Sequence, residues 1–159
     1  FSFLYGVETI KKYTKLGDDF LRHAKTAAES SDKTAISLGM TAAENLVKAR
    51  LNASPLADTQ TKTHGQLINR LGKFTTAKNA KKINSEYMDA LKFFTKHFNG
   101  ARYNPDYPKV HKSTVKKNLR ILTRLSLETH DLVVRVNDIS MSQRQIKVQV
   151  NDESISTAD

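Results

Sequence analysis

Proline, the residue that most strongly ends helices, occupies only three of the 159 positions in this chain: Pro55, Pro105 and Pro108. Glycine is also scarce, with six residues. Between these breaks, apolar residues recur every three or four positions, which is the spacing that gives a helix one buried face. The sequence therefore predicts an all-α fold.

The first part of the chain predicts two long helices. The first extends from Val7 to about Ser30, and its predicted buried face comprises Val7, Ile10, Tyr13, Leu16, Phe20, Ala24 and Ala27. The sequence SSD at 30–32 breaks this pattern and offers polar side chains that can cap a second helix. The second helix ends at the sequence NASP, and its predicted buried face comprises Ile36, Met40, Ala43, Val47 and Leu51.

Three further helices follow. A capping box formed by Thr63 and Gln66 predicts a short third helix that ends near Gly72. The fourth helix stops at the sequence FNG, where Asn99 or Gly100 can adopt the left-handed conformation that closes helices, and its buried face comprises Ile83, Tyr87, Ala90, Leu91, Phe94 and Phe98. The fifth helix buries Val115, Leu119, Leu122, Leu125, Thr129, Leu132 and Val136. The prediction is a five-helix up-and-down bundle with a short third helix.

The end of the chain is open to two interpretations. The segment QIKVQV at 145–150 alternates apolar and polar residues like a strand, but no partner strand is evident. We interpret it as a helix extension or as a mobile tail. The predicted division is a helical domain over residues 1–140 and a polar, acidic and mobile tail over residues 141–159.

The composition favours a polyanionic partner. The formal charge is +10, from 26 Lys and Arg against 16 Asp and Glu, and such an excess is typical of nucleic-acid binding, with solubility alone as the other explanation. The chain has no Cys, which excludes disulfides and thiolate metal sites. No apolar run approaches the roughly 18 residues that a membrane span needs. We therefore expect a cytoplasmic protein without a membrane partner.

Three stretches, taken in order, resemble one family. The stretch AAENLVKARL (42–51) resembles the A-x-E-x-x-x-K-A-x-L signature of HEPN domains, which are helical domains often found beside minimal nucleotidyltransferases. THGQLINRL (63–71) is similar to the family's T-H-x-L-x-x-L short helix, and ARYNP (101–105) is similar to its A-R-Y-P turn. The resemblance covers about residues 16–136. It implies a HEPN-like bundle, a homodimer that pairs through helices beside the ARY turn, and a nucleotidyltransferase as one candidate partner.

The resemblance also implies a candidate catalytic pair. Family members that cut RNA carry an Arg, then four to six intervening residues, then a His that moves the 2′-hydroxyl proton while the Arg stabilises the phosphate charge. Here eight residues separate Arg102 from His111, and the two prolines between them favour turns that can bring the pair together. The alternative is that His111 merely lies near the start of the last helix. One hypothesis is thus a metal-independent endoribonuclease with no cofactor.

Basic residues give the most extended functional signal. Lys112, Lys116, Arg120 and Arg124 recur every four positions and predict one stripe along the last helix that can follow a phosphate backbone. Arg102, Asn104 and Lys109 complete the phosphate-binding candidates, and Tyr103 and Tyr107 are candidates for stacking on unpaired bases. The leading prediction is a HEPN-like nucleotide- or RNA-binding module. The endoribonuclease is the first alternative, and a purely structural dimerisation or interaction domain is the second.

Overall fold

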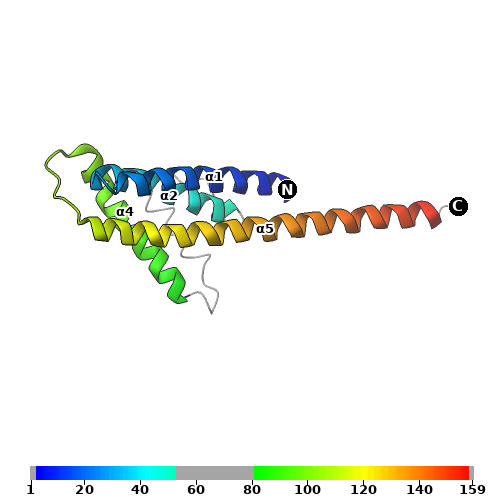
Figure 1. The fold of residues 1–159 in the computed structure, drawn as a ribbon. Coiled ribbons are helices and arrows are strands. Elements are labelled where there is room, and N and C mark those ends of the chain that lie inside the picture. Colours follow the sequence, from blue (N-terminus) through cyan, green and yellow to red (C-terminus); the bar gives the residue numbers. More distant parts are fainter. Residues whose placement is uncertain (1–2, 53–80, 158–159) are drawn as a thin grey trace.

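The computed structural model of this protein describes residues 3–52 and 81–157 (Figure 1). Four helices account for most of these residues: α1 (Phe3–Ala27), α2 (Asp32–Asn52), α4 (Lys81–Tyr103) and α5 (Lys112–Thr157). No strand occurs within the described residues, which confirms the predicted all-α class. The predicted short third helix, with Thr63 and Gln66, lies outside the described residues. The five-helix count therefore stays a prediction.

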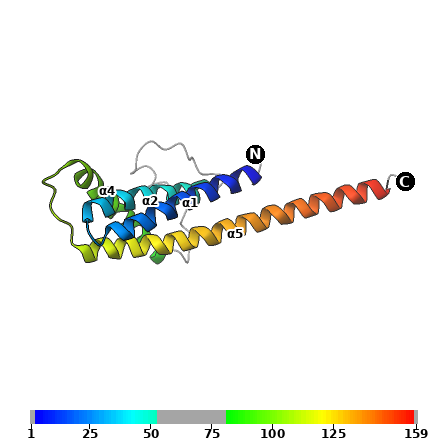
Figure 2. The same ribbon diagram turned by 45° about the horizontal axis from the view of Figure 1, so that its top comes forward.

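The helices pack together as a bundle. α1 and α2 form a hairpin with an extensive contact between them, α5 packs against both, and α4 packs against α2 and α5. α5 runs antiparallel to α1, and its second half extends past the N-terminus of α1 (Figures 1 and 2). Among the described helices, none has the length and hydropathy that crossing a membrane requires.

The buried face of α1 differs from the predicted one. Val7, Ile10 and Ala24 are buried as predicted, but Leu16 is 44% exposed. The face is completed by the residues Thr14, Gly17, Leu21 and Ala28. A side chain at position 17 would begin 2.9 Å from Leu46 Cδ2, so the glycine is what lets α2 approach α1.

Burial of Thr14 on the same face has a local explanation. Its hydroxyl donates a hydrogen bond to the Ile10 carbonyl at 2.7 Å, which satisfies the polar group within its own helix. The predicted face of α1 consisted of regularly spaced apolar residues. It therefore did not include Thr14 or Gly17, which the structure buries.

The remaining helices confirm most of the predicted core. Ser31 caps α2, because its Oγ accepts a hydrogen bond from the Thr34 amide at 3.2 Å. The predicted buried residues of α2 are all buried, as are those of α4 from Tyr87 onwards and those of α5 as far as Thr129.

The end of α4 corrects a second prediction. The helix does not stop at Asn99 or Gly100 but continues to Tyr103, and no described residue has a positive φ. Gly100 serves a different purpose, because a Cβ there would lie 2.0 Å from Cε2 of the Tyr107 ring. The helix ends where it does because Asn104 precedes Pro105, and a residue before proline disfavours the helical conformation.

At the end of the chain, α5 is a single helix of 46 residues that continues to Thr157. Of the two interpretations of the segment at 145–150, the structure therefore has the helix extension. The division of the chain at residue 140 and the mobility of the tail stay predictions.

Candidate functional site

The loop at 104–111, between α4 and α5, is held in place by its own polar groups. The Asn104 side chain accepts a hydrogen bond from the Asp106 amide at 3.0 Å, and the Asn104 carbonyl accepts one from the Tyr107 amide at 3.1 Å. These two bonds build a tight turn of the kind that Asn favours. Asn104, a predicted phosphate contact, thus has a structural role in shaping the turn.

The same loop is bonded to two helices. The Val110 amide donates to Asp32 Oδ2 at 2.8 Å, and Lys33 Nζ donates to the Pro105 carbonyl at 3.0 Å, so both bonds lead to the start of α2. The half-buried Tyr107 packs on α4, and its hydroxyl forms a hydrogen bond of 2.6 Å with His97 Nδ1. These contacts hold the Tyr107 ring against α4, so it is not free to stack on a base.

The His97–Tyr107 bond makes the loop sensitive to pH. Burial, and after it the charge of nearby Lys96, lowers the pKa of His97 from its usual 6.5, so the ring is neutral at pH 7 and can accept from Tyr107. Because the folded-state pKa is depressed, the stability from this bond is present above pH 6.5 and is lost as the pH falls below it.

We expect NMR titration to show His97 protonating below pH 6.5, with the Tyr107 and Gly100 amide shifts changing in the same step. In Tyr107→Phe the coupled change of the amide shifts should disappear. A His97 that titrates at or above 6.5 would contradict the assignment.

Arg102 and Tyr103 are placed at the C-terminal end of α4. The Arg102 guanidinium lies over two rings, 5.4 Å from the centroid of Phe98 and 5.4 Å from that of Tyr103. The Tyr103 side chain is 70% exposed. Of the two predicted stacking residues, Tyr103 is thus the one whose ring is available to a ligand.

His111 begins α5. Its carbonyl accepts the first amides of the helix, from Thr114 at 3.0 Å and from Val115 at 3.2 Å. Its Nδ1 accepts the Ser113 amide at 3.2 Å and lies 2.7 Å from Ser113 Oγ. His111 is therefore a helix-capping residue. It and Arg102 each have partners on their own helix, and the predicted approach of the two to each other stays a prediction.

The predicted basic stripe divides between two sides of α5. Successive residues at a spacing of four drift around a helix by about 40°, so the stripe turns from α1 towards α4. Lys112 and Lys116 pair with Glu29 of the α1–α2 turn at 2.9 and 2.5 Å. Arg124 pairs with Glu86 of α4 at 2.8 Å.

Glu29 neutralises much of the first part of the stripe. Hydrogen bonds and charge from Lys116 and Lys112 lower its pKa to about 2, so the carboxylate is ionised at any physiological pH.

Lys109, on the loop, is exposed. Among the described residues, no ion pair joins Arg120 to a carboxylate.

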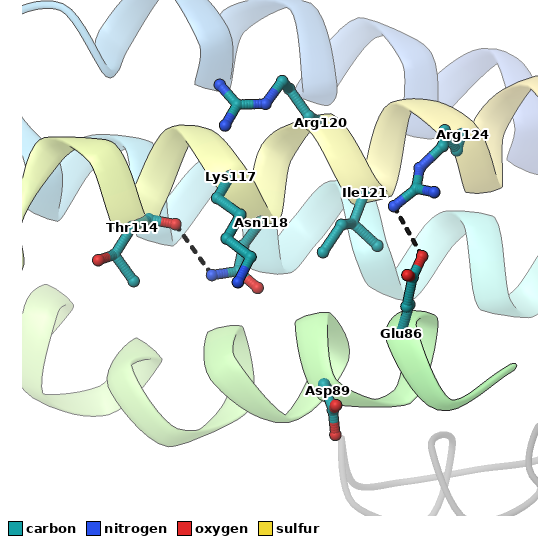
Figure 3. Close-up of a pocket in the computed structure, with 8 residues that line it drawn as sticks. All are labelled: Glu86, Asp89, Thr114, Lys117, Asn118, Arg120, Ile121 and Arg124. Carbon is teal, nitrogen blue, oxygen red and sulfur yellow. Dashed lines mark hydrogen bonds and ion pairs between the residues drawn. The ribbon is translucent and has the colours of Figure 1, made fainter. Parts of the chain in front are cut away.

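A groove of about 600 Å³ lies between α4 and α5 (Figure 3). Its lining consists of Glu86, Asp89, Thr114, Lys117, Asn118, Arg120, Ile121 and Arg124. In Figure 3, Lys117 extends towards α4, whereas the Arg120 guanidinium lies on the side of α5 away from α4. Arg124 and Glu86 meet across one end of the groove.

The groove brings hydrogen-bond donors together. The exposed Lys117 has no carboxylate partner among the described residues, and Thr114, one turn earlier, is also exposed. The Asn118 amide donates to the Thr114 carbonyl at 2.9 Å, which fixes the buried Asn118 on the groove wall. A lysine, a hydroxyl and a guanidinium are the groups that bind phosphate oxygens in proteins.

Sequence reasoning missed most of this groove. The predicted stripe did not include Lys117, and Glu86, Asp89, Thr114 and Asn118 were not predicted as site residues. Only the packing of α4 on α5 brings these residues together. Comparisons of the chain with protein-family models, with curated proteins and with solved structures found no match.

Proposed function

We propose that this protein is a nucleotide- or RNA-binding module that receives a phosphate group in the α4–α5 groove. The observation that carries the proposal is the cationic side chain of Lys117, which has no carboxylate partner among the described residues and lies on the wall of a groove of about 600 Å³. A free ammonium group in a concave site gains most from an anion that replaces its water.

The neighbouring residues suit a phosphate ester better than a simple anion. Arg124 can donate to a phosphate while it keeps its contact with Glu86, because a guanidinium carries five N–H donors. Asp89 and Glu86 are acceptors on the opposite wall, where the amino group of a base or a ribose hydroxyl can donate to them. This mixed lining favours a nucleotide or an unpaired RNA segment over a bare polyanion.

The residues at the ARY turn extend the proposed contact. Tyr103 offers an exposed ring, and Arg102 lies against it, so the pair can stack on an unpaired base. Lys112 and Lys116 contribute less than the sequence predicted, since each is already paired with Glu29.

The resemblance to HEPN domains supports the same proposal. The stretch AAENLVKARL lies within α2 and includes seven buried residues, and ARY forms the last three residues of α4. The first stretch thus lies in a helix, as the resemblance implies, whereas ARY ends α4 and only Asn104 and Pro105 belong to the turn that the resemblance implies. On this basis we include in the proposal a HEPN-like fold, pairing into a homodimer and a nucleotidyltransferase as one candidate partner.

The proposal predicts binding of single-stranded RNA that weakens steeply with salt. Replacing Lys117 by methionine should remove one phosphate contact, which lowers the slope of log affinity against log salt by about one unit. Fluorescence anisotropy with a labelled oligonucleotide measures both quantities. Lys15→Met is the matched control, because Lys15 is an exposed lysine of α1. This control should leave the slope close to that of the parent. Equal slopes for Lys117→Met and the parent would refute the proposed contact.

A further inference from the structure

A second pocket, of about 180 Å³, lies on the other side of α5 from the α4–α5 groove. It is formed by α5, the end of α1 and the turn that follows α1, and we call it the α1–α5 pocket. Its lining consists of Lys25, Ala28, Glu29, Lys116, Leu119 and Arg120. Ala28 and Leu119 are buried, so the charged side chains are what the pocket offers to a ligand.

Two cations of the α1–α5 pocket have no acidic partner. Lys25, in the last turn of α1, and Arg120 are both exposed, and among the described residues neither forms an ion pair with a carboxylate. In Figure 3 the Arg120 guanidinium lies on the side of α5 away from α4, which is the side of this pocket. Arg120 also lines the α4–α5 groove. It therefore lies between the two sites and links them.

The size and charge of the α1–α5 pocket suit a single phosphate group. Its lining has three cations against one carboxylate, which leaves it positive and favours an anion. Its volume of about 180 Å³ is below the roughly 300–1,000 Å³ of pockets that enclose a small molecule, whereas the groove of about 600 Å³ is within that range. The groove thus has room for a nucleotide, and the pocket has room for a phosphate next to it in the same strand.

The surroundings disfavour an RNA strand that follows α5 along its length. Towards the start of the helix, Lys112 and Lys116 are already paired with Glu29. Towards its end, the next exposed residues on this face include the apolar Leu127 and the acidic Asp131. The cations without a carboxylate partner instead lie across the helix, from the groove on one side to the α1–α5 pocket on the other.

We propose that a single RNA strand crosses α5, with one phosphate in the α4–α5 groove and another in the α1–α5 pocket, where Lys25 and Arg120 bind it. The proposal rests on the proposed function, because the groove holds the first phosphate. The two sites are separated by the width of α5, about 10–12 Å with its side chains, so a strand of a few nucleotides reaches both. Glu29 limits the affinity, because its carboxylate holds Lys116, which lines the same pocket.

The salt dependence of RNA binding tests the second phosphate contact. Fluorescence anisotropy with a labelled oligouridylate of about ten nucleotides provides the affinities. Lys25→Met should lower the slope of log affinity against log salt by about one unit. Lys15→Met is the matched control, because both residues are exposed lysines of α1 and only Lys25 lines the pocket. The control should keep the slope of the parent.

Glu29→Gln should tighten RNA binding by about tenfold, because it frees Lys112 and Lys116 to donate charge-assisted hydrogen bonds to phosphate. Asp19→Asn is the control for net charge. It removes one carboxylate from α1, where Asp19 pairs with Arg22 at 3.5 Å, and it should bind RNA within a few fold of the parent. Equal gains for the two variants would overturn the role of Glu29.

The variants of the two sites separate this proposal from the proposed function. If Lys117→Met and Lys25→Met each lower the slope, the strand contacts both sides of α5. If Lys117→Met lowers the slope and Lys25→Met behaves like Lys15→Met, the groove holds phosphate without a strand that crosses α5, and only the present proposal is overturned. If Lys117→Met keeps the slope of the parent, the proposed function fails and the crossing fails with it.

Discussion

Replacing Phe94 by alanine should lower the free energy of unfolding by about 3–5 kcal/mol, the usual cost of removing a fully buried aromatic ring. Phe94 has no exposed surface. Its ring lies directly against Gly39 of α2, where an added Cβ would be 2.4 Å from Cε1. The small residue and the large one fit each other at the α2–α4 contact, so the cavity left by alanine would have little nearby to fill it.

Urea denaturation followed by circular dichroism measures this loss. Phe93→Ala is the matched control, because Phe93 is the half-buried neighbour whose ring lies 5.2 Å from that of Phe94. The control should lose clearly less stability than Phe94→Ala. If the two variants lose equal stability, Phe94 does not have the central place in the core that we assign to it.

The second large effect concerns the groove. The double variant Lys117→Glu, Arg124→Gln should weaken RNA binding by about 10²-fold, because two charge-assisted hydrogen bonds to phosphate are lost at roughly 1.5 kcal/mol each. Glutamine at position 124 keeps an amide donor for Glu86, and the ion pair across the groove is thus replaced by a neutral hydrogen bond. Thermal melting of the double variant checks that the fold is retained.

A matched double variant on α1 separates a local effect from a change in net charge. Lys15→Glu, Arg22→Gln changes the same residue types in the same way, and Arg22 also has a carboxylate neighbour, Asp19, at 3.5 Å. This control should bind RNA within a few fold of the parent. Equal losses for the two double variants would mean that binding follows total charge rather than the groove.

Much of the fold could be predicted from the sequence because most of its helices bury large apolar residues at a regular spacing. The buried residues of α2 and α5 follow this rule. It fails where packing depends on the absence of a side chain, as at Gly17 against Leu46 and at Gly100 against Tyr107. A glycine inside a helix and a glycine that ends one look alike until the partner helix or loop is known.

The candidate site could be predicted only in its composition. The sequence identified the basic residues of α5, but it could not show that Glu29 approaches Lys112 and Lys116 or that Glu86 approaches Arg124. These carboxylates come from other elements, far away in sequence. They neutralise part of the predicted stripe. Lys117, which lies outside the stripe on the groove wall, has no carboxylate partner among the described residues.

The most direct test of the proposed phosphate site is to map where a nucleotide binds. Amide chemical shifts in a ¹H–¹⁵N spectrum, recorded during titration with a short single-stranded RNA, report the contact residue by residue. We predict that the largest changes occur at Thr114, Lys117 and Asn118, which line the groove on α5. Saturable changes that leave these three amides unmoved, or no changes at all in low salt, would contradict the assignment of the groove as the phosphate site.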